Sequence, residues 1–202
     1  MSPRPKKASD EQVFAAAQRV MSRLGPSQLK LADIAAEAGL TAGALVQRFG
    51  SKLGLLRALT AGMGDWVKQM FAELRAANPS PLGTLRAYAD CIAEMGESPA
   101  TLAHHLGWLQ LDLTDPVLHR HLARQARATR AAFRGLLEAA VVAGELKPRT
   151  DTATLARAVE VTLTGSLMTS AFYQDGPAKR WIREDLEAVL RPLATGRPRR
   201  RV

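Results

Sequence analysis

The sequence contains little that a secreted, membrane or catalytic protein needs. Cys91 is the only cysteine among 202 residues, so no internal disulfide framework can form, and we expect a reducing compartment, the cytoplasm. No uninterrupted apolar run reaches the roughly 18 residues of a membrane span, and the N-terminus MSPRPKKASDEQ lacks the apolar stretch of a signal peptide. We therefore expect a protein without a membrane partner.

The chain also lacks a glycine-rich phosphate loop and a recognisable pair of nucleophile and base. Its histidines, His104, His105, His119 and His121, include no pair at i and i+4, the spacing that places two metal ligands on one helix face. We expect no metal, no cofactor and no enzymatic activity. A helical enzyme with a lipophilic pocket remains the alternative from another class.

The basic excess lies at the two ends of the chain. The formal net charge is +9, with 28 Lys and Arg against 19 Asp and Glu. Residues 1–52 hold 8 basic and 4 acidic residues, residues 197–202 hold four arginines, and residues 53–196 are nearly neutral. This distribution favours an N-terminal segment that binds a polyanion. The alternative is that the basic ends only keep the protein soluble.

Helical spacing of apolar residues runs through the whole chain and predicts an all-α protein of about nine helices. Ser9 or Asp10 can cap the first, which ends at Gly25 and Pro26. The spacing predicts further helices over 31–38, 41–49, from Ser51 to about Phe71, and over 82–96, 99–113, 116–143, 151–173 and 178–194.

Residues 31–50 carry the signals of a helix-turn-helix. Ala35 is small where two helices must cross closely, and Gly39 can adopt the turn conformation that other residues resist. On a helical wheel Leu45 and Phe49 point inward, which leaves a nearly bare outer face that includes Gln47.

A helix with small outward residues can approach the edges of bases in the DNA major groove closely. Gln47 is suited to a bidentate contact with adenine, whereas Arg48, Lys52 and Thr41 are suited to phosphates. The residues expected to contact DNA are Lys30, Thr41, Ala42, Gly43, Ala44, Val46, Gln47, Arg48 and Lys52. The alternative is that the small residues pack against another helix.

Residues 9–69 resemble the DNA-binding domain of the TetR family of transcriptional regulators. The family pattern D-I-A-x-x-A-G-L-T-x-G-x-L, followed by Phe and then Lys, is matched here by Asp33, Ile34, Ala35, Ala38, Gly39, Leu40, Thr41, Gly43, Leu45, Phe49 and Lys52. The family usually has a phosphate-binding tyrosine at the position of Val46 and often His or Tyr at that of Arg48. Phosphate binding would then pass to Arg48 and Lys30.

The resemblance implies a three-helix, homeodomain-like TetR head, residues 9–69, and a helical effector-binding and dimerisation domain, residues 70–196. Basic flexible tails would be residues 1–8 and 197–202. The implied function is a homodimer that binds a palindromic double-stranded DNA operator, as a repressor released by a small lipophilic or aromatic ligand. A TetR-like protein without a small-molecule effector is the second alternative.

Aromatic, methionine and neighbouring side chains in the larger domain suit a lipophilic cavity and equally an ordinary core. The candidate ligand-binding residues are Trp66, Met70, Tyr88, Met95, His105, Trp108, Leu109, Phe133 and Met168. In the family the last two helices pair across the two-fold axis. The candidate interface residues are Leu163, Leu167, Ser170, Trp181 and Val189.

Gly62 and Gly64 lie within the predicted fourth helix, where each glycine costs about 1 kcal/mol relative to alanine. They predict a hinge between the DNA-binding and effector domains, or else a place where helices pack closely.

Overall fold

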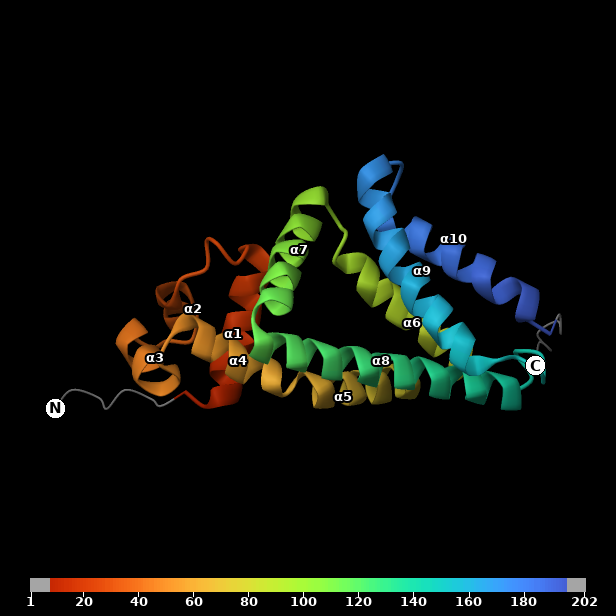
Figure 1. Ribbon diagram of the computed structural model, residues 1–202, viewed down its shortest axis with the longest axis horizontal. Helices are drawn as coiled ribbons and strands as arrows, with labels where there is room; N and C mark the ends of the chain where they lie inside the picture. The colour runs from red at the N-terminus through yellow and green to blue at the C-terminus, as the bar shows by residue number, and fades with distance from the viewer. Residues whose placement is uncertain (1–7, 196–202) are drawn as a thin grey trace. The chain divides into compact units, whose positions relative to one another are not determined.

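The computed structural model describes residues 8–195, and nearly all of them are helical (Figure 1). The elements are α1 (Asp10–Arg23), α2 (Leu31–Glu37), α3 (Ala42–Phe49), α4 (Lys52–Ala61), α5 (Met63–Ala77), α6 (Pro81–Glu94), α7 (Pro99–Thr114), α8 (Pro116–Val142), α9 (Thr152–Tyr173), α10 (Ala178–Leu190) and the 3-10 turn η1 (Arg191–Leu193). Within the described range, β structure amounts to one bridge between Leu146 and Ala194. The all-α prediction is confirmed.

None of these described helices is long and apolar enough to cross a membrane. The predicted basic tails, except for Ala8, lie outside the described residues.

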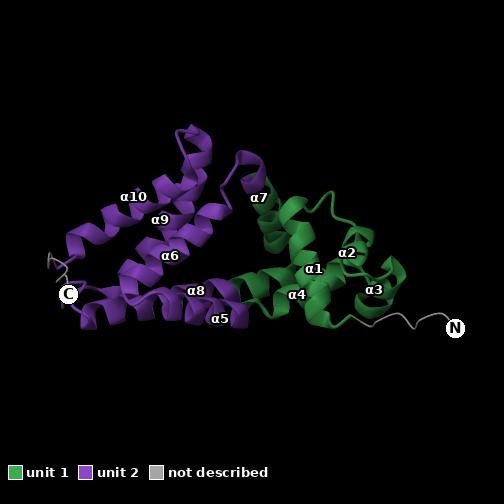
Figure 2. Cartoon of the chain, turned by 180° about the vertical axis from the view of Figure 1, so that it is seen from behind, with its two compact units in different colours: residues 1–63, 103–123 green, residues 64–102, 124–202 purple. Residues whose placement is uncertain are grey.

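The chain divides into two compact units (Figure 2). The first comprises Met1–Met63 and Ala103–Ala123, and the second comprises Gly64–Leu102 and Arg124–Val202. The first unit is therefore discontinuous in sequence, because it includes most of α7 and the beginning of α8. It differs in this from the contiguous head over residues 9–69 that the family resemblance implies.

The first unit is built around the apolar faces of α1 to α4. Its buried cluster comprises Val13, Ala17, Val20, Leu29, Ile34, Ala35, Leu45, Leu55, Leu56 and Leu59. Trp108 and Leu111 of α7 pack against this cluster, and Trp108 Nε1 donates a hydrogen bond to the Met21 carbonyl at 3.3 Å. Trp108, which lies 87 residues from Met21 in sequence, thus completes the core of the first unit.

The prediction of one long fourth helix is wrong, because the structure divides this segment into α4 and α5. Gly62 ends α4 with φ −85° and ψ −5°, and its N–H donates to the Thr60 carbonyl. A Cβ at Gly62 would meet nothing within 4 Å, so close packing does not explain this glycine. A Cβ at Gly64 would lie 3.3 Å from Arg124 Cδ. The extra break accounts for ten α-helices in residues 8–195 where about nine were predicted.

The second unit contains a core that α6, α9 and α10 share with parts of α5 and α8. One face of α9 is buried through Leu155, Val159, Leu163, Ser166 and Leu167. Ser166 Oγ donates to Asp185 Oδ2 of α10 at 2.6 Å, so the polar group on this face is satisfied. The α9 and α10 helices lie side by side in Figure 1.

Local sequence determines where several helices begin. Ser9 forms a reciprocal capping box with Gln12, while Thr41, Ser51, Ser80 and Asp151 each accept a backbone N–H at the start of their helices. Ser9 rather than Asp10 is therefore the first cap. These hydroxyl and carboxylate caps satisfy N–H groups that would otherwise lack a partner within the helix.

Candidate nucleic-acid interface

The turn between α2 and α3 depends on a left-handed residue. Gly39 has φ +67°, a conformation that glycine adopts without the steric cost of a side chain. The next N–H, of Leu40, donates to the Ala35 carbonyl at 2.8 Å. These two features reverse the chain tightly and place α3 directly after α2, as the helix-turn-helix pattern predicts.

The α3 helix is oriented by two inward side chains. Leu45 is completely buried, and Phe49 packs against Phe14 with ring centroids 5.9 Å apart. On the other side Gly43 and Gln47 are exposed, and Val46 is 48% exposed. The helix therefore presents a surface of small and uncharged groups, with one amide side chain available to a partner.

The N-terminus of α3 carries polar groups suited to an anion. Thr41 Oγ1 accepts the Ala44 N–H at 3.2 Å, which leaves the hydroxyl proton free to donate. The backbone amides of this first turn also add positive potential. Lys30, just before α2, is exposed, and its backbone N–H donates to Asp33 Oδ2 at 2.9 Å.

A hollow of about 480 Å³ borders the outer face of α3. It is lined by Ala8, Leu40, Ala44, Gln47 and Arg48. The predicted base-contacting residue Gln47 and the first described residue of the chain therefore share one surface.

Arg48 is engaged with the start of the chain. Its guanidinium Nη1 donates to the Ala8 carbonyl at 2.6 Å, and it forms an ion pair with Asp10. The group also lies 5.5 Å from the centroid of the Phe49 ring, a cation–π arrangement. In this structure Arg48 thus connects α3 to the N-terminus of α1.

Lys52 also has protein partners. Its ammonium Nζ donates to the carbonyls of Pro26 and Leu29, both at 3.0 Å, and so fastens the loop between α1 and α2 to the start of α4. Two of its three protons are used in this way. Phosphate binding by Lys52 stays a prediction, and the observed contacts give it a positioning role.

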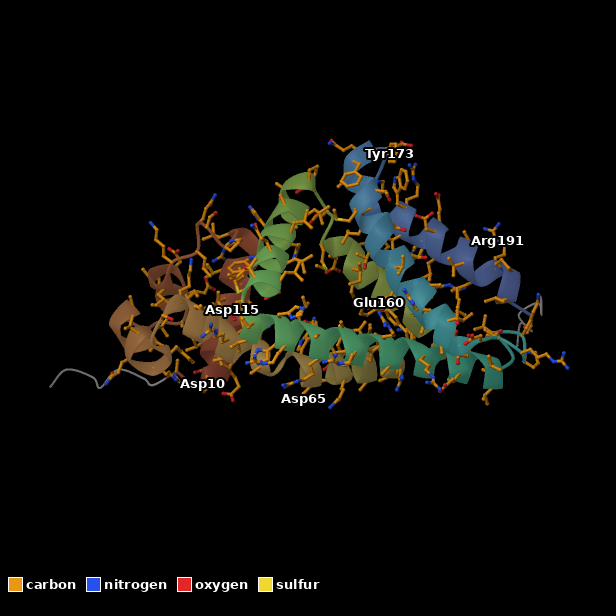
Figure 3. All side chains as sticks on the ribbon, viewed as in Figure 1. Asp10, Asp65, Asp115, Glu160, Tyr173 and Arg191 are labelled. Atoms are coloured by element: carbon orange, nitrogen blue, oxygen red, sulfur yellow. The ribbon has the colours of Figure 1, made fainter. Side chains whose placement is uncertain are left out.

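Asp115 is an anchor for α4 that the sequence pattern does not single out. It lies at the start of α8, where Figure 3 labels it. Its carboxylate accepts from Arg57 Nε at 3.2 Å and Nη2 at 2.5 Å, and from the Val117 and Leu118 N–H groups. The Arg57 hydrogen bonds and then these backbone donors lower its pKa to about 2. Its position just before Pro116 was the available signal for a helix cap.

The predicted ligand-binding residues are divided between the two units. Trp108 belongs to the core of the first unit, and Leu109 is 40% exposed. His105, in the same helix, is half-buried, and burial lowers its pKa. In the second unit Trp66 is 47% exposed, whereas Phe133 is only 1% exposed.

The core alternative fits the aromatic residues of the second unit. Tyr88 stacks on Phe71 at 4.9 Å and meets Phe133 edge-on at 5.1 Å between ring centroids. Burial raises the pKa of Tyr88 to about 12. Met70, Met95 and Met168 pack partly buried against the same core. Their role in ligand binding stays a prediction.

Three of the predicted dimer residues face the core of their own chain. Leu163, Leu167 and Ser170 are 3%, 7% and 5% exposed, so they are not on an outer surface of α9. Trp181 stacks on Tyr173 at 5.5 Å, and Val189 is half-buried against the second core. Sequence spacing does not separate the two sides of α9, because both of them carry apolar residues.

Two family models match the chain. The model described as "Bacterial regulatory proteins, tetR family" matches residues 13–59, and the one described as "Tetracyclin repressor-like, C-terminal domain" matches residues 108–186. Together they cover more than half of the sequence. Among curated protein sequences none matches.

Solved structures share the fold at low sequence identity. A TetR transcription regulator from Haloarcula marismortui has a TM-score of 0.73 and 14% identity, covering 92% of this chain and 97% of its own. SmeT, the repressor of a Stenotrophomonas maltophilia multidrug efflux pump, has a TM-score of 0.64 and 19% identity, over 96% and 94%. FadR from Bacillus subtilis, in complex with stearoyl-CoA, also has 0.64 and 19%, over 90% and 97%.

Proposed function

The chain belongs to the TetR family of transcriptional regulators, and we propose that it acts as a homodimeric repressor which leaves its DNA operator when a small lipophilic ligand binds. The observation that carries the DNA-binding proposal is the orientation of α3. Its buried Leu45 fixes the helix so that Gly43, Val46 and Gln47 face outward. This surface can enter a major groove without a steric barrier.

Each exposed group on this face has a distinct task in the proposal. Gln47 makes the base contact, and Val46 packs against the groove, where an apolar group can meet a thymine methyl. Thr41 and the N-terminus of α3 bind one phosphate, and Lys30 binds another.

We propose that dimerisation uses the exposed side of α9 instead of the core residues chosen from sequence. Exposed Val161, Gly165 and Phe172 recur there, with half-buried Ala158 and Met168, at intervals of three and four residues. Val161 is 64% and Phe172 is 69% exposed, and a Cβ at Gly165 would meet nothing within 4 Å. This spacing suits a seam between two paired helices, and a two-fold dimer matches a palindromic operator.

The proposal of a lipophilic ligand is supported by α7. Leu106, Leu109 and Leu113, again spaced by three and four residues, are 37%, 40% and 57% exposed. An apolar strip of this kind can bind an alkyl chain. FadR, which shares the fold, was solved with stearoyl-CoA, a ligand with a long alkyl chain.

A regulator without a small-molecule effector is the second candidate, and the aromatic cluster favours it. The rings of Phe71, Tyr88 and Phe133 pack against one another in the core of the second unit. Two of the residues expected to bind the ligand, Tyr88 and Phe133, are thus occupied in packing.

Selection of bound sequences from random duplex DNA tests the DNA-binding proposal. We expect enrichment of a palindrome whose half-site centres lie about 34 Å apart or a multiple of this distance. Recovery of sequences without a shared motif, bound no more tightly than unselected duplex, would refute it.

Titration with stearoyl-CoA, with and without the selected duplex, tests whether this compound is an inducer. If the compound is an inducer, DNA must lower its affinity by the same factor by which it lowers DNA affinity. The intrinsic fluorescence of Trp108, which lies in α7 with Leu106, Leu109 and Leu113, gives a signal for the titration. Identical affinities in both titrations would show that this compound is not the inducer.

A further inference from the structure

The last turn of α7 contains a carboxylate without a partner. Asp112 is half-buried, and no described residue forms a hydrogen bond or an ion pair with its side chain. Asp115, three residues later, is bound instead by Arg57 and by two backbone N–H groups. Of these two acidic side chains, Asp112 is therefore the one whose charge no group in the described part of the chain neutralises.

Burial makes this negative charge unfavourable in the free protein. Desolvation raises the pKa of Asp112 to about 6, so the carboxyl group is still mostly ionised at pH 7. Its oxygens remain accessible to a ligand, since every fully buried side-chain nitrogen or oxygen of the described residues has a hydrogen-bond partner and those of Asp112 have none. A cation that reached these oxygens would offset the cost of the unpaired charge.

The end of the helix adds to the negative potential around Asp112. The α7 helix ends at Thr114, so Asp112 lies within its last turn, and this turn contains no basic residue. The last carbonyl groups of a helix have no partner within it and attract positive charge. Figure 3 labels Asp115 just beyond this end of α7. The carboxylate and the helix end therefore both favour a cation.

The exposed leucines of α7 lie beside the same carboxylate. Leu106, Leu109 and Leu113 fall within about 60° of one another on a helical wheel, and Asp112 is the neighbour of Leu109 at about 60° on one side. All four residues belong to the first unit. From Leu106 to Leu113 the helix rises about 10 Å. One side of α7 thus combines an apolar strip with a negative charge near its C-terminal end.

We infer that this side of α7 binds a lipophilic cation, an amine in its ammonium form, whose nitrogen lies against Asp112 and whose apolar part covers Leu109 and Leu106. The inference rests on the lipophilic ligand proposed above and specifies its charge. An ammonium group donates charge-assisted hydrogen bonds to a carboxylate, which offset its own desolvation. The alkyl chain of stearoyl-CoA could contact the same leucines, but its anionic head would be repelled by Asp112.

Three probes with the same chain length test the inference: octylamine, which is an ammonium ion at pH 7, neutral 1-octanol and anionic octanoate. Trp108 lies in α7 and reports binding by its fluorescence. We expect the wild type to bind octylammonium most tightly and octanoate least tightly. Asp112→Asn should weaken the binding of octylammonium about tenfold or more, because a hydrogen-bonded charge pair is lost. It should leave the affinity for octanol nearly unchanged and raise the affinity for octanoate.

Two control variants separate the charge of Asp112 from other effects. Glu184→Gln removes one negative charge from an exposed residue of α10 and should leave all three affinities unchanged. Leu109→Ala removes part of the apolar strip and should weaken all three probes by a similar factor. Asp112→Asn should melt at the same temperature as the wild type or higher at pH 7, because it removes an unpaired and partly desolvated charge. A lower melting temperature would show that the carboxylate stabilises the fold and would overturn the inference.

The outcomes distinguish this inference from the proposed function. If Asp112→Asn changes the three affinities by the same factor, or if octanoate binds the wild type more tightly than octylammonium, recognition of a cation is refuted while the lipophilic strip stands. If no probe binds, or if Leu109→Ala leaves every affinity unchanged, the strip is not a ligand site and both proposals about the ligand fail. All affinities are measured without DNA, so they do not depend on whether the protein is a repressor.

Discussion

Phe172 provides a quantitative test of the proposed dimer face. Complete burial of a phenylalanine side chain contributes about 1.5–3 kcal/mol. Phe172 is 69% exposed in the single chain, so covering the remainder contributes about 1–2 kcal/mol. Two-fold symmetry doubles this to about 2–4 kcal/mol. Phe172→Ala should therefore raise the dimer dissociation constant by roughly 30- to 900-fold.

Sedimentation equilibrium over a range of concentrations measures this constant. Val142→Ala is the control, because Val142 is 89% exposed but belongs to α8 and not to the proposed seam on α9. It should dimerise like the wild type. Phe172→Ala should fold with nearly unchanged monomer stability, since most of the side chain has no partner in its own chain.

Leu163→Ala should behave in the opposite way. Leu163 is 3% exposed within the second core, so its truncation should cost about 2–5 kcal/mol of folding stability. Its direct effect on association should be small. An unchanged dissociation constant for Phe172→Ala would refute the proposed seam. Dissociation of an otherwise stable Leu163→Ala would restore the face predicted from sequence.

Three further substitutions give separate outcomes. Gln47→Ala should relax base preference at one position of each half-site, with a cost of about 1–3 kcal/mol at the preferred base, and a repeated selection would detect it. Arg57 holds the pKa of Asp115 at about 2, below its ordinary 3.8, so this ion pair stabilises the fold above that ordinary value and the contribution is lost as pH falls toward 2. Arg57→Leu should therefore reduce the change in unfolding free energy between pH 4 and 2, as measured by urea unfolding. The same pH dependence as in the wild type would contradict the assignment. Gly62→Ala should raise the melting temperature by about 1–4 °C, because its backbone angles suit alanine and its Cβ has space. Gly64→Ala would press on Arg124 and should gain less.

The helix-turn-helix could be predicted from sequence because its signals are local. Gly39 alone marks the left-handed turn, and Thr41 alone marks the start of α3. The wheel then assigns Leu45 to the core correctly, because a short amphipathic helix has one apolar face. The structure agrees with the sequence predictions for the turn at Gly39, the cap at Thr41 and the burial of Leu45.

The contacts that sequence could not predict join residues remote from one another in the chain. No periodicity could show that Arg48 reaches Ala8, 40 residues earlier, or that Lys52 donates to Pro26 and Leu29. On α9 apolar residues occur on both sides, so periodicity could not tell the core face from the exposed one. Only the packing of Leu163 against the second core decides between them.

The discontinuous first unit constrains how such a regulator can exchange its DNA-binding specificity during evolution. Recombination that transfers only residues up to Met63 would bring Met21 and Arg57 without the α7 and α8 residues that they contact. Trp108 would then need a new carbonyl acceptor and Asp115 a new cation. Residues 1–63 should therefore be inherited together with Ala103–Ala123. A gene fusion made directly after Met63 should yield a first unit with an incomplete core. In this chain, α1 to α4 and residues 103–123 belong to one structural unit.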